Sequence, residues 1–130
     1  MNQRNGENLP EKSATSPARE YNLERRTAQF AKDSINFAKG IRRDVINNPL
    51  IRQFIRSSTS IGANYCEADE AESGKEFRYR IGICKREARE TKHNIRMLVA
   101  AQPEIREEAK VLWQEAKEFT LIFAAILRSK

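Results

Sequence analysis

The chain has 130 residues, of which 39% are hydrophobic and 32% are charged, and this length supports a single domain with one core. Its few prolines and glycines, four and five, argue against an all-β sandwich or barrel, which needs frequent turns. No apolar run is long enough to cross a membrane, and the N-terminus lacks the apolar stretch of a secretory signal. Two cysteines are too few for a disulfide scaffold, so we expect a reduced, cytoplasmic protein.

The net charge of +6 is spread unevenly along the chain. Residues 73–102 carry eight basic and three acidic side chains, and residues 21–48 carry six and three. Residues 49–72, in contrast, carry two basic and four acidic side chains. A basic excess of this kind is compatible with nucleic-acid contact without demonstrating it.

Two regions are expected: a tail over residues 1–18 and a helical domain over residues 19–130. The tail is rich in Asn, Ser, Pro and single charges, which predicts a disordered or loosely held segment.

The first helix of the domain is expected from about Glu20 to Asn47. Its stripe of apolar and small residues comprises Leu23, Thr27, Phe30, Ser34, Phe37, Ala38, Ile41 and Val45.

The second helix is predicted from Pro49 to about Glu70, with Asn48 as its N-cap. Its middle is a run of small residues, which allows the backbone of a neighbouring helix to approach closely. The apolar face of this helix is formed by Leu50, Ile51, Phe54, Ile55, Ser58, Ile61, Tyr65 and Ala68.

The third helix is expected over residues 74–101, because Ser73 and Glu76 have the spacing of a capping box. The fourth helix is expected to begin at Pro103. We expect Phe77, Leu112 and Phe123 to be buried. Four helices joined by short connections predict an all-α fold, an antiparallel up-down-up-down four-helix bundle.

Catalytic sites are not evident in the sequence. Glu90 and His93 have the spacing of a carboxylate-bundle metal ligand pair, but a di-iron centre needs two such motifs and the chain has one histidine. Cys66 and Cys84 fall on or near apolar faces, where a free cysteine behaves as a small hydrophobe. We therefore expect no enzyme activity, no catalytic residue, no metal site and no cofactor.

The strongest candidate site is a row of basic residues on the third helix. Its members are spaced by three, four or seven residues, so they share one face of the helix. A second row repeats every seven residues on the first helix. Together they predict a surface that binds phosphates, although a solvated outer face with incidental cations remains the alternative. The two rows comprise Lys75, Arg78, Lys85, Arg89, Lys92 and Arg96 on the third helix, and Arg25, Lys32 and Lys39 on the first.

The other flank of the third helix mixes charged and apolar residues beside its core stripe. Such a mixture is typical of subunit contacts in coiled coils, but ordinary core-edge residues would give the same pattern. We take Ile83, Glu87 and Met97 as the candidate subunit interface.

Two stretches in the middle of the chain resemble one protein family. The first is Phe54–Ala68, in which a run of small residues is followed by Asn64, Glu67 and Ala68. The second runs from Ser73 through Thr91. Together they resemble the second and third helices of the 23S rRNA intervening-sequence proteins, and the resemblance extends over about residues 23–127.

The resemblance implies a non-enzymatic antiparallel four-helix bundle. Relatives are encoded within insertions in ribosomal RNA genes. Similar bundles are accessory proteins of diversity-generating retroelements, where they form basic, barrel-like pentamers that contact nucleic acid and a reverse transcriptase. A homopentamer with an RNA or DNA partner is therefore implied here. Relatives commonly have an aromatic residue near the position of Asn94, and this chain departs from that pattern.

The sequence thus favours a non-enzymatic oligomer that binds RNA or DNA through backbone phosphates. A scaffold or accessory subunit that binds another protein, without nucleic-acid contact, is the second hypothesis. Neither hypothesis involves a membrane.

Overall fold

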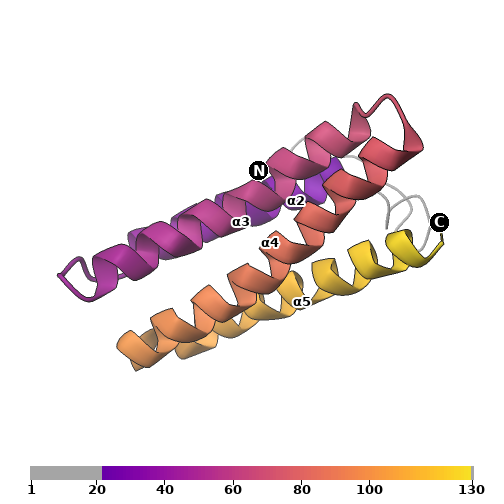
Figure 1. The fold of residues 1–130 in the computed structure, drawn as a ribbon. Helices are drawn as coiled ribbons and strands as arrows, with labels where there is room; N and C mark the ends of the chain where they lie inside the picture. Colours follow the sequence, from indigo (N-terminus) through magenta and orange to yellow (C-terminus); the bar gives the residue numbers. More distant parts are fainter. Residues whose placement is uncertain (1–21, 130) are drawn as a thin grey trace.

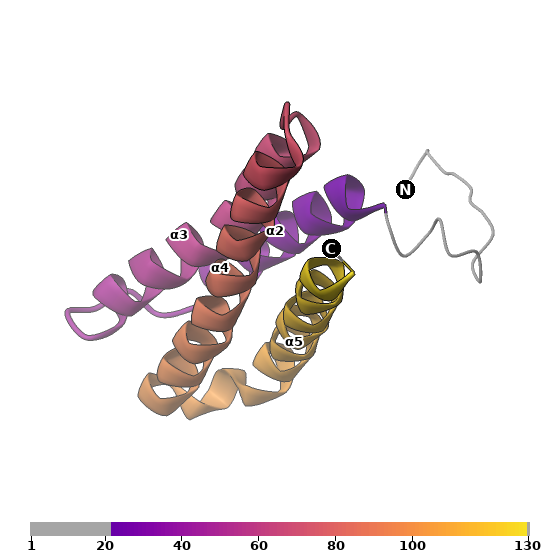
Figure 2. The same cartoon turned by 45° about the vertical axis from the view of Figure 1, so that its right-hand side comes forward.

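A computed structural model of the chain describes residues 22–129, which form a bundle of four long helices without strands. Figure 1 shows α4 lying across the front of the molecule between α3 and α5, and Figure 2 shows α2 behind them. The predicted all-α four-helix bundle is confirmed, whereas the up-down-up-down order of all four helices stays a prediction. The predicted tail, residues 1–18, lies outside the described residues. The elements are α2 (Leu23–Lys39), α3 (Asn47–Asp69), α4 (Gly74–Ala101), one turn of 3₁₀ helix, η1 (Pro103–Ile105), and α5 (Arg106–Arg128).

The first helix ends eight residues earlier than its periodicity predicts, at Lys39 rather than at Asn47. Ile41 is still buried, but it reaches the core from the turn after α2. Val45 is 83% exposed, so its place in the predicted apolar stripe is wrong. The helix ends before Gly40, but Ile41 follows with helical spacing. The apolar pattern therefore continues past the end of the helix, and the sequence alone does not show where the helix ends.

The start of α3 is capped by Asp44 rather than by the predicted Asn48. Asp44 Oδ1 accepts hydrogen bonds from the backbone N–H groups of Asn47, at 2.7 Å, and Ile46, at 3.1 Å. These bonds satisfy donors that a helix leaves unpaired at its first turn. The bond from Asn47 favours the ionised carboxylate and lowers the pKa of Asp44 from its usual value.

The turn before α3 is tied to the turn between α4 and α5. Asn47 Nδ2 donates to the carbonyl of Arg42 at 2.9 Å and to Gln102 Oε1 at 3.1 Å. Gln102 Oε1 also accepts the backbone N–H of Arg42 at 3.2 Å. Both amide side chains are buried, so these bonds fix the two turns at one end of the bundle.

The remaining helix starts follow the predicted local signals. The Ser73 hydroxyl accepts the backbone N–H of Glu76 at 3.1 Å, and α4 begins at Gly74 as expected. Pro103 opens η1, and α5 continues from it at Arg106. The predicted bounds of the third helix are therefore confirmed, and the fourth begins with one tighter turn.

Aromatic residues of α2 and α5 meet in the core. Phe30 of α2 and Phe119 of α5 make an edge-to-face contact with ring centroids 5.5 Å apart, and Phe119 stacks on Phe123 at 6.1 Å. Leu112 and Phe123 are buried as predicted. Phe77 is only half-buried and packs against the edge of the core, so its predicted burial is wrong. It lies in the first turn of α4, where that helix begins to meet its neighbours.

Small and polar residues fill the seam between α3 and α4. Ser57 Oγ lies 3.0 Å from both Thr91 Oγ1 and Asn94 Nδ2, and all three residues are buried. Ile61 and Cys84 meet further along the seam, where the thiol lies 3.6 Å from the carbonyl oxygen. The contact at Ser57 of α3 is made with Thr91 of α4, and the contact at the later residue Ile61 is made with the earlier residue Cys84. The two helices are therefore antiparallel.

Gly62 of α3 allows close contact with α2. A Cβ atom at this position would lie 3.0 Å from Thr27 Oγ1 and 3.3 Å from Thr27 Cβ. Thr27 is fully buried, and its hydroxyl already donates to the carbonyl of Leu23 at 2.7 Å. The run of small residues thus brings the two backbones together, as the sequence predicts.

Ser34 has a fully buried hydroxyl without a hydrogen-bond partner among the described residues. We expect Ser34→Ala to raise the free energy of unfolding by about 0.5–2 kcal/mol, because alanine removes an unsatisfied polar group and favours the helix. Ser57→Ala is the matched control and should destabilise the chain, since it removes the partner of Thr91 and Asn94. Urea denaturation measures both changes. A lower stability of the Ser34 variant would contradict the prediction.

Candidate nucleic-acid interface

The predicted basic row lies on the outer surface of α4. Lys85 and Lys92 are half-buried at the edge of the bundle, and the other four members are exposed. None of the six forms an ion pair with a carboxylate of the described residues. The five ion pairs in this part of the chain use other cations: Arg26, Arg42, Arg56 (twice) and Lys110.

The structure adds an aromatic residue to this row, and it comes from α5. Trp113 is half-buried, and the Lys92 ammonium lies 5.3 Å from the centre of its ring system. The ammonium of Lys117, one turn further along α5, lies 5.9 Å from the same centre. Sequence reasoning missed Trp113 because this residue has the spacing of the apolar stripe of α5, four residues from Ala109 and three from Ala116. The four-residue spacing of Trp113 and Lys117 was the available signal.

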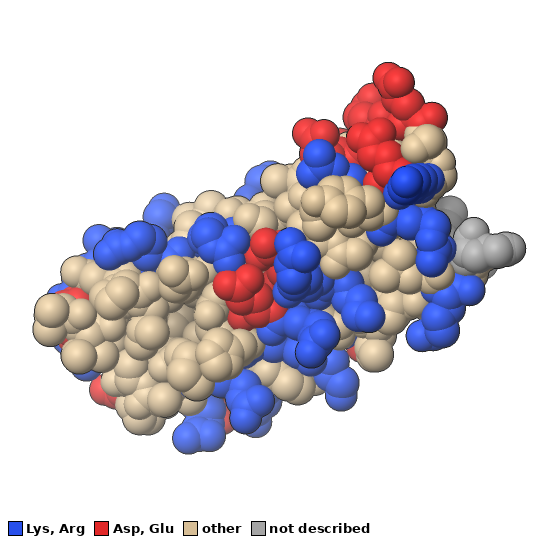
Figure 3. Space-filling model, viewed as in Figure 1, with Lys and Arg blue, Asp and Glu red and all other residues tan. Residues whose placement is uncertain are grey.

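Acidic side chains gather in two places on the face that carries α4. Figure 3 shows Lys and Arg spread over α4 and toward α5, one group of Asp and Glu at the turn between α3 and α4, and a second acidic group between basic side chains in the middle of the face. The acidic end is formed by exposed residues of that turn and its flanks: Glu67, Asp69, Glu70, Glu72 and Glu76. This end of the bundle is therefore acidic, although Lys75 of the basic row lies within it, and the rest of the row lies beyond it along α4.

The two predicted basic rows do not form one continuous surface. Arg25, Lys32 and Lys39 are exposed on α2. However, α2 packs against α3 and α5, whereas α4 packs between α3 and α5. The row on α2 therefore belongs to a different side of the bundle, and α4 with α5 makes the more concentrated candidate site.

The mixed flank of α4 faces α3 of the same chain. Arg56 Nη2 donates to Glu90 at 2.6 Å, and Arg56 Nη1 lies 3.4 Å from Glu87, which is 8% exposed. Asn94 donates to the carbonyl of Gln53 at 3.1 Å, so the residue that departs from the family pattern contributes to this seam.

The three candidate interface residues are placed differently along that flank. Glu87 is engaged by Arg56 within the subunit, and Ile83 is half-buried. Met97 is 37% exposed and lies toward the end of the bundle where the turn residues Val45 and Ile46 are also exposed.

The Glu90–His93 spacing does not assemble a ligand cluster. Glu90 pairs with Arg56, and His93 is exposed. Residues 22–129 contain no group of three or more His, Cys, Asp or Glu side chains positioned to hold a metal ion. Burial raises the pKa of the Cys84 thiol to about 12, which keeps it protonated. Cys66 is exposed, so of the two cysteines placed on or near apolar faces only Cys84 is buried as a small hydrophobe.

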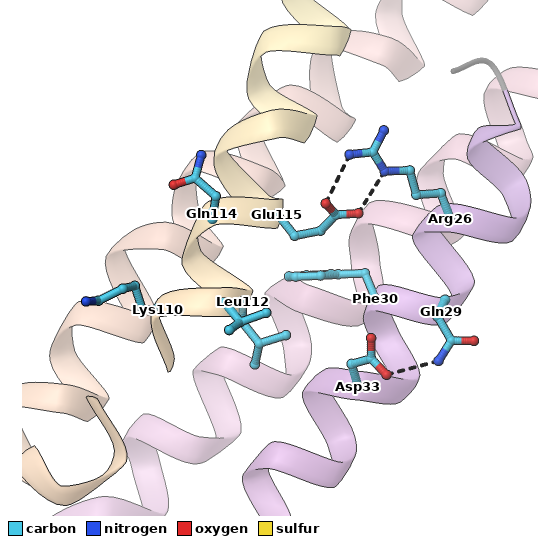
Figure 4. Close-up of a pocket in the computed structure, with 9 residues that line it drawn as sticks. Arg26, Gln29, Phe30, Asp33, Lys110, Leu112, Gln114 and Glu115 are labelled. Atoms are coloured by element: carbon cyan, nitrogen blue, oxygen red, sulfur yellow. Dashed lines mark hydrogen bonds and ion pairs between the residues drawn. The ribbon is translucent and has the colours of Figure 1, made fainter. Parts of the chain in front are cut away.

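A groove of about 620 Å³ separates α2 from α5 on the side away from the α3–α4 seam. Figure 4 shows an ion pair across it, in which Arg26 Nε and Nη2 donate to the two oxygens of Glu115 at 2.8 and 3.0 Å. Gln29 also donates to Asp33 at 2.9 Å on its α2 wall. These mutual pairings leave the groove mixed in charge, unlike the α4–α5 face.

The fold defines a helical-bundle protein with a basic face on α4 and without an evident catalytic centre among the described residues. The family model of the 23S rRNA-intervening sequence proteins matches residues 19–125, and the chain belongs to this family.

A solved structure supports the same fold. The chain is similar to a protein of unknown function from the S23 ribosomal protein family of Bacteroides thetaiotaomicron, with 27% identity and a TM-score of 0.70. The likeness covers 81% of this chain and 97% of the other. No curated protein gives a significant match. No helix among the described residues is both long and apolar enough to span a bilayer.

Proposed function

We propose that the protein is a non-enzymatic bundle that binds RNA or DNA through backbone phosphates on the basic face of α4. The observation that carries this proposal is the row of six cations without a carboxylate partner in residues 22–129. A solvated helix face usually mixes both signs in pairs, as Arg56 does with Glu87 and Glu90 on the other flank of α4.

The length of the row suits a polyanion. From Lys75 to Arg96 the helix rises about 32 Å, at about 1.5 Å per residue. This distance matches about nine successive phosphates of one strand of a duplex. Phosphate contacts carry no base information, so binding through this row should depend weakly on sequence and strongly on salt.

A salt titration tests the proposal directly. The variant Lys85→Gln/Arg89→Gln/Lys92→Gln should flatten the log–log salt slope by about 2–3 units if all three side chains meet phosphates. Glutamine keeps helix propensity close to that of the replaced residues, so the fold should persist. Fluorescence anisotropy with labelled RNA and DNA oligonucleotides measures the slope.

The second basic row supplies a matched control. Arg25→Gln/Lys32→Gln/Lys39→Gln removes the same charge from α2 and should change the slope less, because those side chains lie on another side of the bundle. An unchanged slope in the α4 variant would overturn the proposal. If the wild-type chain binds neither nucleic acid at low salt, a protein-binding scaffold becomes the better interpretation.

A homo-oligomer, with five subunits as the resemblance implies, is the expected assembly of this protein. Its support in the structure is the exposed apolar surface of Val45, Ile46 and Met97 at one end of the bundle. Multi-angle light scattering should give the mass of a pentamer at micromolar concentration, and Met97→Glu should shift the equilibrium toward smaller species. A wild-type monomer throughout that range would contradict this assembly.

A further inference from the structure

We propose that Trp113, together with Lys92 and Lys117, is a stacking site for an unpaired base, so that the preferred ligand of the basic face is single-stranded nucleic acid. This inference rests on the proposed function and deepens it. It names the strandedness of the ligand and one residue that contacts a base.

The geometry of the three side chains carries the proposal. Two ammonium groups lie 5.3 and 5.9 Å from the Trp113 ring centre, and they come from different helices. Neither lysine pairs with a carboxylate of residues 22–129. Both ammonium groups lie over the ring, so a base that stacks on the indole would replace them there and bring its flanking phosphates beside two cations without a carboxylate partner.

The indole itself keeps part of its surface and its polar group available. Trp113 is half-buried, so it is anchored against the core and still exposed to solvent. Its N–H donates no hydrogen bond to another described residue and is not among their buried unpartnered atoms. A buried tryptophan normally finds a hydrogen-bond partner, so this N–H, which is neither fully buried nor partnered, is available to a ligand.

The surroundings of Trp113 extend the site along α4. Arg89 and Arg96 precede and follow Lys92 by three and four residues, so both lie on its face of the helix. A positively charged track with one aromatic platform is the combination that binds single strands, since every base has a face that can stack. A regular duplex keeps its bases stacked on one another and offers the indole no free base face.

Tryptophan fluorescence tests the inference without any mutation. Trp113 is the single tryptophan of the chain, so its emission reports on this position alone. Titration at low salt with U12 RNA, dT12 DNA and a 12-base-pair duplex should quench the emission with the single strands and leave it nearly unchanged with the duplex. The two single strands separate an RNA preference from a DNA preference.

Substitution of Trp113 gives the second measurement. Trp113→Leu should weaken binding of the single strands roughly 5- to 150-fold, the range expected for one lost base–aromatic stack, and leave duplex binding unchanged. Trp113→Phe should retain most of the affinity. Thermal melting of each variant verifies that the bundle is folded, and the wild-type fluorescence result stands if a variant is not.

The outcomes separate this inference from the function on which it rests. All three nucleic acids could bind with steep salt dependence while the Trp113 emission stays constant during titration and the Trp113→Leu variant binds as tightly as the wild type. In that case the stacking site is wrong and phosphate binding stands. Equal quenching by duplex and single strands would also overturn the preference. If none of the ligands binds at low salt, the proposed function fails and the stacking site fails with it.

Discussion

Replacing Phe119 with alanine should lower the free energy of unfolding by about 3–5 kcal/mol, the usual range for losing a fully buried aromatic side chain. Phe119 is 0% exposed. Its ring contacts Phe30 and Phe123, and the Arg26 guanidinium lies 5.3 Å from its centre. The substitution therefore removes contacts that join α2 to α5 as well as apolar volume. A domain of this size has only about 5–15 kcal/mol of stability, so urea denaturation should show the loss clearly.

Phe77→Ala is the matched control for this prediction. It makes the same chemical change on α4, but at a half-buried position on the edge of the core. We expect a clearly smaller loss, because less area returns to water and a cavity at the surface can fill with solvent. Equal losses for the two variants would mean that Phe119 is not at the centre of the packing.

Gly62→Ala and Gly82→Ala should differ in stability by about 1–3 kcal/mol, although both exchange glycine for alanine within a helix. A Cβ at Gly82 meets no atom within 4 Å, so alanine should stabilise α4 by about 1 kcal/mol through helix propensity. A Cβ at Gly62 meets buried Thr27, whose hydrogen bond to Leu23 holds it in place. The same gain in propensity is then opposed by crowding between α2 and α3.

Thermal and chemical denaturation of the two variants side by side measure this difference. Because propensity is common to both, the difference isolates the steric cost of separating the helices. The double variant Gly62→Ala/Thr27→Ala removes the opposing hydroxyl, which a Cβ at position 62 would meet at 3.0 Å, and relative to Thr27→Ala alone it should recover part of the loss. Equal stabilities of the two single variants would show that the backbones can move apart freely.

The helices could be predicted closely wherever local signals mark their ends. Ser73 and Glu76 fixed the start of α4, and Pro103 fixed the start of the next element, because caps and prolines act within one turn of chain. The end of α2 was missed because Ile41 is apolar, buried and in helical register although it lies in a turn. Burial from a turn and burial from a helix give the same sequence pattern.

The candidate site could be predicted only in part. The row on α4 follows from the spacing of its cations on a single helix. The contact of Lys92 with Trp113 depends on how α4 lies against α5, and no pattern within either helix contains that information. The candidate subunit interface at Ile83, Glu87 and Met97 stays a prediction. The partner that Glu87 has within its own chain, Arg56, lies on α3 and is 31 residues away, so no pattern within α4 could show it.

The placement of α2 has a consequence for how the bundle opens. It is the shortest of the four helices, with 17 residues, and the groove beside Arg26 and Glu115 separates much of it from α5. Elements with fewer packed neighbours open at a lower free-energy cost than the whole molecule. Amide protons of α2 should therefore exchange with solvent sooner than those at the centre of α4. Such an opening would leave the α4–α5 pair, and the basic face that it carries, intact.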